Sequence, residues 1–176
     1  MKAILAMAQN RVIGKNGGLP WPSIKEDFKW FKEFTMGKKL IVGKNTFDTL
    51  PLLKNREILV LTRMVEELDA YVQNQYFVNN NGLSGKMIDI RDVIIFELKN
   101  NPDIIVAGGA KTYVRLLPYI TEFYVTHVNG SYDGDTFMPP FEDLFTNKEV
   151  VKEFDGHKVI KYTKWYEQSR YTNIQP

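Results

Sequence analysis

Asp27 is an acidic residue in a stretch whose pattern is otherwise apolar on its side, and this makes it the first candidate for chemistry. At about 100° per residue, a helix over 23–35 separates an apolar side from a charged side, and Asp27 falls on the apolar side. The other members of that side are Ile24, Phe28, Phe31 and Phe34. An ionised carboxylate is costly to bury without a partner, so such a residue usually has a ligand or a catalytic role. An acid at the helix flank that reaches solvent, or caps a neighbouring loop, is the alternative, and the helix alone favours neither.

The segments around Asp27 favour a ligand site. Ser23 and Glu26 have the spacing of a capping box, which predicts that the helix begins at Ser23. Residues 11–22 contain three glycines and end in Pro20-Trp21-Pro22, which predicts a mobile loop with a stiff, extended end. Such a loop beside a buried acid can admit a ligand and then exclude water. An ordinary surface loop with a packed tryptophan is the alternative.

Two strand-glycine-helix segments predict a second site, for phosphate. One turns at Gly43 and the other at Gly108-Gly109, and this geometry directs free backbone N–H groups and the positive helix end at an anion. The side chains at these helix starts that suit phosphate are Lys44, Thr46, Lys111 and Thr112. A further strand ends in Thr62-Arg63, which adds a cation at the same sheet edge. The pattern favours a dinucleotide without the usual GxGxxG motif, and its surplus cations favour NADPH over NADH.

The elements that must position these residues form an α/β fold. Four short runs that are apolar throughout predict buried strands of a parallel sheet: 3–8, 40–42, 58–61 and 104–107. The alternating segments 122–128 and 158–162 predict antiparallel strands. Further helices are predicted at 43–50, 89–100 and 108–117, the first and last stopped by prolines, with a turn at 79–82. We expect an open, mostly parallel central sheet with an antiparallel C-terminal edge, flanked by about four helices.

Composition limits the class of protein. The 176 residues are expected to form a single domain, and apolar residues at 44% with a net charge of +2 indicate neither a nucleic-acid binder nor a membrane protein. The sequence has no cysteine and only two histidines, His127 and His157, far apart, so we expect no disulfide and no metal centre. The N-terminal apolar run is too short for a signal peptide. We therefore expect a cytoplasmic protein, and a monomer.

The order and spacing of these residues resemble dihydrofolate reductase. The residues that carry the resemblance are Val12-Ile13-Gly14, Leu19-Pro20-Trp21, Asp27, Phe31, Gly43-Lys44-x-Thr46, Arg56, Gly108-Gly109, Tyr113, Thr126 and Gly134-Asp135-Thr136. The match runs from Ile4 to about Tyr162 and is loose between Met64 and Pro102. It implies NADPH-dependent reduction of 7,8-dihydrofolate to 5,6,7,8-tetrahydrofolate, binding of antifolates, and an adenosine-binding subdomain at roughly 38–100. A pyrimidine reductase on the same scaffold, and a pterin- or nucleotide-binding protein without turnover, are the alternatives.

The resemblance also implies roles for single residues. Asp27 would hold the pterin's amino group and adjacent ring nitrogen, Thr126 would bridge to the same carboxylate, and Trp21 would order a water near the pterin. Arg56 would clamp the α-carboxylate of the glutamate tail. Other substrate-binding residues would be Ile4, Leu5, Phe28, Phe31, Leu50, Leu53, Ala107 and Tyr113. Cofactor-binding residues would be Ala6, Ile13, Gly14, Leu19, Gly43, Lys44, Asn45, Thr46, Thr49, Leu61, Thr62, Arg63, Gly108, Gly109, Ala110, Lys111, Thr112 and Thr136, and the Gly108–Gly109 peptide would be cis.

The sequence departs from the family pattern at several positions. Asp27 lies six residues after Trp21, where many bacterial relatives have five, but Glu26 falls on the charged side of the helix and is the poorer candidate. The other departures are Ala107 for a larger aliphatic residue, Ala110 for glycine, Lys44 for arginine and Asn45 for histidine or serine. A slacker pterin pocket and weaker binding of some antifolates are expected from Ala107, and a less forked phosphate contact from Lys44.

Overall fold

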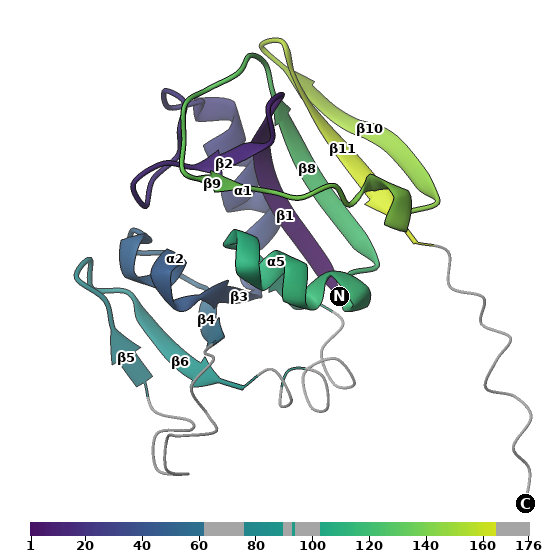
Figure 1. Ribbon diagram of the computed structural model, residues 1–176. Helices are drawn as coiled ribbons and strands as arrows, with labels where there is room; N and C mark the ends of the chain where they lie inside the picture. The colour runs from purple at the N-terminus through teal and green to yellow at the C-terminus, as the bar shows by residue number, and fades with distance from the viewer. Residues whose placement is uncertain (62–75, 90–92, 94–102, 165–176) are drawn as a thin grey trace, which may run out of the picture.

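A nine-stranded sheet forms the centre of the molecule (Figure 1). The computed structural model describes residues 1–61, 76–89, 93 and 103–164. The strand order is β10-β11-β8-β1-β7-β3-β4-β6-β5. No helix in these ranges is both long and apolar enough to cross a membrane.

The middle of the sheet is parallel and both of its edges are antiparallel. The parallel strands are β8 (Glu122–Val128), β1 (Lys2–Ala8), β7 (Ile105–Val106), β3 (Lys39–Gly43), β4 (Glu57–Leu61) and β6 (Ser84–Ile88). The antiparallel edge strands are β11 (His157–Thr163) and β10 (Asn147–Phe154) at one side, and β5 (Tyr76–Val78) at the other. The expected sheet, with its antiparallel C-terminal edge, is confirmed, while β5, β6 and β10 were not predicted.

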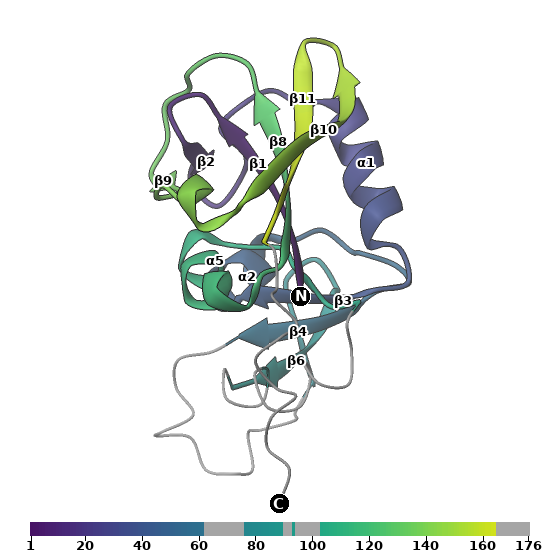
Figure 2. The same cartoon turned by 90° about the vertical axis from the view of Figure 1, so that its right-hand side faces the viewer.

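Each central strand is buried on both faces, which is why its sequence is apolar throughout. In β1, Leu5 packs into one hydrophobic cluster and Ile4 into the other. The first cluster includes Tyr113 and Leu116 of α5 (Ala110–Leu116). The second receives α1 (Lys25–Thr35) through its partly buried aromatic residues, and α2 (Lys44–Thr49) through Phe47. Figure 2 shows α1 and α5 on opposite sides of the sheet.

Two helix boundaries differ from the sequence prediction. Helix α1 begins at Lys25, not at Ser23: Ile24 is the N-cap, its backbone is extended, and no side chain caps it. The stiff Pro20-Trp21-Pro22 segment precedes this extended residue, so Ser23 lies outside the first turn and the capping box does not form. Helix α5 ends at Leu116, and the chain continues into a 3-10 helix, η2 (Leu117–Tyr119). Pro118 lies in the first turn of η2, where a missing N–H costs little, so the proline does not end the helical path. The helix predicted at 89–100 lies largely outside the described residues.

Candidate active site

The side chain of Asp27 is buried in the first turns of α1, as its position in the sequence pattern predicts. The residue is 9% exposed, and its Oδ1 accepts a hydrogen bond of 2.7 Å from Thr126 Oγ1 in β8. Burial raises the pKa of Asp27, while the hydrogen bond from Thr126 and the charge of His157 lower it to a lesser extent. Within the described ranges, no lysine or arginine pairs with this carboxylate. The carboxylate therefore retains acceptor capacity for a ligand that can donate hydrogen bonds.

Apolar side chains cover the face of the sheet on which α1, the helix of this acid, packs. Those packed against the cluster of Ile4 include Phe31, Leu50, Leu53 and Ala107, all partly buried. Phe28 is 49% exposed, and so it projects from the apolar side of α1 instead of packing into the core as the helical pattern suggested. Leu5 packs into the cluster on the opposite face, so its side chain does not contribute to this wall.

Trp21 presents a polar atom that has no hydrogen-bond partner among the described residues. Its ring is 5% exposed and packs edge-to-face on Tyr132, with ring centroids 5.8 Å apart. The indole Nε1 is buried and has no hydrogen-bond acceptor in the described part of the chain. Since buried N–H groups are nearly always paired, this donor suits a bound ligand or an ordered water.

The loop at 11–22 is more structured than the glycines predict. Its strand β2 (Val12–Gly14) pairs with β9 (Thr136–Phe137) in a separate two-stranded sheet. Further along the loop, Asn16 N donates to Asp135 Oδ2 at 2.7 Å. A Cβ on Gly17 would lie 2.9 Å from Thr49 Cγ2, so the loop reaches the C-terminal end of α2. Leu19 is 44% exposed, whereas Ile13 packs against the cluster of α5.

The two glycine turns lie side by side because β3 and β7 are neighbours in the sheet. Gly43 N donates to Gly108 O at 2.7 Å, and the Gly108–Gly109 peptide is cis, as expected. A Cβ on Gly43 would lie 2.7 Å from Thr112 Oγ1, and one on Gly109 would lie 2.9 Å from Thr46 Oγ1. Side chains at either glycine would therefore fill a cradle that two threonine hydroxyls border. Such a cradle fits a phosphate group.

The lysines at these turns differ from one another. Lys44 pairs with Asp48 in its own helix, with Nζ 2.6 Å from Oδ2, so an anion must compete for it. Lys111 is exposed at the start of α5. Among the other expected cofactor residues, Leu61 is buried in the core. Thr62 and Arg63 lie outside the described residues.

Tyr113 joins the second glycine turn to the central strand. Its hydroxyl donates to Ile4 O at 2.6 Å, and the ring is only 3% exposed. Burial raises the pKa of Tyr113 far above its ordinary value, so the hydroxyl stays protonated. Tyr113 thus fixes the middle of β1 relative to α5.

Arg56 is held rigidly at the end of α1 by three acceptors. Its Nε donates to Thr35 Oγ1 at 2.8 Å, Nη1 to Lys54 O at 2.8 Å and Nη2 to Lys32 O at 3.0 Å. A guanidinium has five N–H groups, so one on each Nη atom remains, which is the arrangement that grips a carboxylate with two parallel bonds. The Arg56 guanidinium is therefore anchored by the protein while two of its N–H groups stay available to a ligand.

Sequence reasoning missed two buried polar residues that support the site. Thr35 is fully buried and donates to Phe31 O at 2.6 Å while it accepts from Arg56. Asn79 is 8% exposed, and its Nδ2 donates to the carbonyls of Phe47 and Leu50 at 2.6 and 2.9 Å. The only sequence signal for Asn79 was its place in a predicted turn.

The fold and the site together define the class of protein: an α/β protein with paired glycine turns on neighbouring parallel strands and a buried acid on the first helix. The family model for dihydrofolate reductase matches residues 1–168. The chain is 34% identical to dihydrofolate reductase type 8 of Escherichia coli, over 93% of this chain and 95% of the relative. It is 31% identical to dihydrofolate reductase of Bacillus subtilis (strain 168), over 93% and 89%.

A solved structure of a dihydrofolate reductase is also similar to this chain. Dihydrofolate reductase from Enterococcus faecalis, complexed with NADP(H) and RAB-propyl, superposes with a TM-score of 0.68 at 25% identity and covers 92% of this chain and 94% of its own. The chain belongs to the dihydrofolate reductase family, and it catalyses the NADPH-dependent reduction of dihydrofolate to tetrahydrofolate. Nothing in these comparisons supports the pyrimidine reductase or the protein without turnover.

Proposed function

We propose that Asp27 binds the pterin of dihydrofolate and supports its protonation. The observation that carries this proposal is a buried carboxylate whose one described hydrogen bond comes from Thr126. A pterin amino group and the adjacent ring N–H are paired donors, so they supply the partner that the carboxylate lacks. Binding at this end of the ring system places the acid away from N5, where the proton is needed.

Trp21 completes the proton path in this proposal. Its unpaired indole N–H holds a water in the closed cleft, and the water delivers the proton to N5 while Asp27 polarises the ring from its other end. The loop at 11–22 excludes bulk water, since it lies against Thr49 on one side and is bound to Asp135 on the other. Phe31, with its apolar neighbours, forms the wall against which the substrate lies.

The residues of the glycine cradle hold the cofactor. NADPH, when bound, supplies the hydride for C6 of the pterin. Gly43 and Gly109 admit the phosphates, with the hydroxyls of Thr46 and Thr112 at the border of the cradle. The exposed ammonium group of Lys111 is available to a phosphate, and that of Lys44 becomes available when its ion pair with Asp48 opens. Contacts from Thr62 and Arg63 stay a prediction from the sequence.

The pH profile tests the role of Asp27. Thr126→Val removes the hydrogen bond that lowers the pKa of Asp27, so this pKa should rise further. Activity depends on the protonated site and falls as the pH rises through this pKa, so the decline of kcat/KM should move to higher pH. The check is the rate of NADPH absorbance loss with dihydrofolate across the pH range. A decline at the wild-type pH in Thr126→Val would contradict the proposal.

We further propose that Arg56 binds the α-carboxylate of the glutamate tail. Arg56→Lys loses the two parallel N–H groups, and the KM for dihydrofolate should rise about 10-fold to 100-fold with little change in kcat, since the tail is remote from the reacting atoms. Arg115→Lys, on the exposed side of α5, is the matched control. An unchanged KM in Arg56→Lys would place the tail elsewhere.

The remaining assignments concern assembly and location. We infer a monomer, because the helices of one chain cover both faces of the central sheet. We infer that the protein works in the cytoplasm, where a fold without cysteine needs no disulfide. Antifolates are expected in the cleft of Asp27.

A further inference from the structure

The turn between β5 and β6, residues 79–83, is bound to the C-terminal end of α2 (Figure 1). Asn79 Nδ2 donates to Phe47 O at 2.6 Å and to Leu50 O at 2.9 Å. Asn81 Nδ2 adds a second bond to Leu50 O, also of 2.9 Å. The last carbonyl groups of a helix lack N–H partners further along the helix, so two side chains of this turn supply donors to the end of α2.

Asn79 holds the turn as well as the helix. Its Oδ1 accepts from Asn81 N at 2.9 Å and from Leu83 N at 3.0 Å. Together with the two donated bonds, these bonds use both N–H groups and both lone pairs of the side-chain amide. Strand β6 also packs directly on α2, because a Cβ on Gly85 would lie 2.6 Å from Phe47 Cε2. A buried amide that is fully paired with two segments fixes their relative position.

Residues 50–56 follow α2 and carry three of the residues that we expect to contact dihydrofolate. Leu50 and Leu53 are partly buried and pack on the face of the sheet that α1 covers. Arg56 ends the segment directly before β4. The positions of these three side chains therefore depend on how the two ends of the segment are held.

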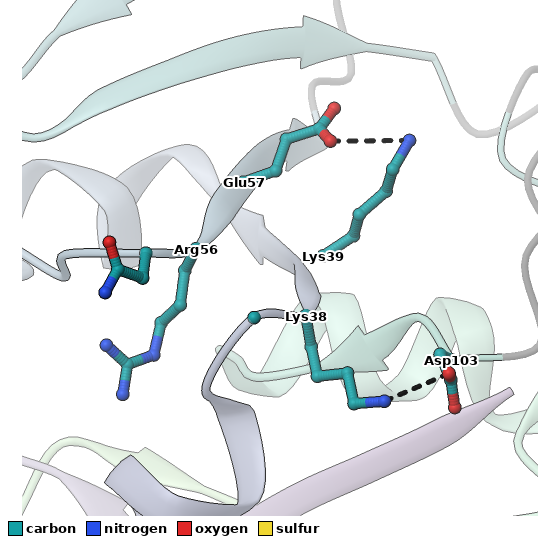
Figure 3. Close-up of a pocket in the computed structure, with 7 residues that line it drawn as sticks. Lys38, Lys39, Arg56, Glu57 and Asp103 are labelled. Carbon is teal, nitrogen blue, oxygen red and sulfur yellow. Dashed lines mark ion pairs between the residues drawn. The ribbon is translucent and has the colours of Figure 1, made fainter.

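The C-terminal end of this segment is held by the chain that leaves α1. Arg56 Nε donates to Thr35 Oγ1 at 2.8 Å, and Gly37 N donates to Asn55 O at 2.9 Å. Figure 3 shows Arg56 at this end, with the nearby lysines directed at acidic partners and not at its guanidinium. The N-terminal end of the segment is the end of α2, where the turn 79–83 is bound.

We propose that Asn79 and Asn81 are positioning residues for dihydrofolate: they fix the N-terminal end of residues 50–56 and so hold Leu50 in the wall of the substrate site. The inference rests on the proposed substrate wall. The turn lies in the stretch from Met64 to Pro102, in which the resemblance to the family is loose, so the family pattern assigns it no role.

The effect should fall on the substrate more than on the cofactor. The start of α2 has an attachment of its own, the bond of 2.7 Å from Gly43 N to Gly108 O. Loss of the bonds from the turn therefore leaves the glycine cradle in place and releases the opposite end of the helix. The substrate wall is at that released end.

The test measures kcat and the KM for each substrate from the loss of NADPH absorbance. Asn79→Ala should raise the KM for dihydrofolate about 3-fold to 10-fold, the size expected for one or two lost hydrogen bonds. The wall contacts the substrate before and during the reaction alike, so kcat should change by less than about 2-fold, and so should the KM for NADPH. A role in folding alone would lower stability and leave this ratio of effects unmoved.

A second substitution applies even if Asn79→Ala folds poorly. Asn81 is exposed, and Asn81→Ala removes a donor to Leu50 O while Asn79 stays in place, so the KM for dihydrofolate should rise about 2-fold to 3-fold. Asn80→Ala is the matched control, since Asn80 is exposed in the same turn and makes no side-chain hydrogen bond within the described part of the chain. Phe145→Leu, in the cluster on the other face of the sheet, should lower stability without a change in KM.

Leu50→Ala separates this inference from the proposed wall. If Leu50→Ala raises the KM for dihydrofolate and neither asparagine variant does, the wall stands and the positioning role is overturned. If Leu50→Ala leaves this KM unchanged, the wall is wrong and the inference falls with it. A rise in Asn80→Ala or Phe145→Leu as large as that in Asn81→Ala would also overturn the positioning role.

Discussion

Replacement of Asp27 by asparagine should stabilise the free protein while it removes activity. The carboxylate is buried, and its described hydrogen bond is the one from Thr126. Asparagine keeps an oxygen that can accept this bond but carries no charge. The cost of burying the charge is several kcal/mol, and a hydrogen bond to a charged group offsets about 1.5–3 kcal/mol of it. We therefore expect Asp27→Asn to raise the free energy of unfolding by about 1–2 kcal/mol at pH 7.

The pH dependence of this effect follows from the direction of the pKa shift. Burial raises the pKa of Asp27 in the folded protein above its unfolded value. The folded protein thus binds the proton more tightly, so Asp27 costs no stability at a pH below its unfolded pKa and an increasing amount as the pH rises through its folded pKa. The stabilisation by Asp27→Asn should accordingly shrink towards zero in acid. Urea titrations at several pH values, read from midpoints at constant m-value, measure it.

The same variant should lose about 100-fold to 1,000-fold in kcat/KM at neutral pH, the range of a lost acid-base group. Glu26→Gln is the matched control, since it removes a neighbouring charge that is exposed on the same helix, and it should change stability by less than about 0.5 kcal/mol. Wild-type turnover in Asp27→Asn would refute the catalytic role. A loss of stability at pH 7 would refute the account of the buried charge.

Two further substitutions test the elements that support the site. Gly43→Ala should raise the KM for NADPH at least about 10-fold, more than that for dihydrofolate, because the new Cβ would lie 2.7 Å from Thr112 Oγ1. Gly82→Ala is a control outside the cradle: its Cβ meets nothing within 4 Å, so the strain of an alanine at φ +77° should lower stability and leave the KM for NADPH unchanged, and equal effects on this KM would contradict the cradle. Asn79→Ala should lower the free energy of unfolding by about 1–3 kcal/mol in urea titrations, since it removes two bonds donated to carbonyls and two accepted from N–H groups, and Asn79→Asp should not rescue it because a carboxylate cannot donate. Full stability in Asn79→Asp would show that the donated bonds are unimportant.

The sequence was most informative where burial leaves a periodic signal. Strands β1, β3 and β4 lie between two layers of side chains, and their uninterrupted apolar runs predicted both their positions and their parallel pairing. Strand β10 has no buried residue and therefore no such signal, and it was missed. The hairpin of β5 and β6 is short, and only its turn was predicted.

The same reasoning explains which site residues were found. Asp27 was recognised because an acid breaks an apolar helix face, and the paired glycines because they end apolar strands. Arg56 was found only through the family resemblance, and Asn79 was missed, because both depend on carbonyl groups of other segments and no local pattern records such partners. Helix α1 began two residues later than its capping box predicted because the preceding chain stays extended.

Strand β7 is the point at which the two halves of the site are joined. It lies between β1, which pairs with the strand of Thr126, and β3, the strand of the first glycine turn. Just after β7, Gly108 O accepts from Gly43 N, and from the following helix the Tyr113 hydroxyl reaches Ile4 O. Hydride transfer requires the nicotinamide and pterin rings to be held in a fixed relative position, and a small displacement of either ring lowers the rate. Because both bonds start from the stretch between Gly108 and Tyr113, we expect a displacement of this stretch to move the glycine turns relative to β1.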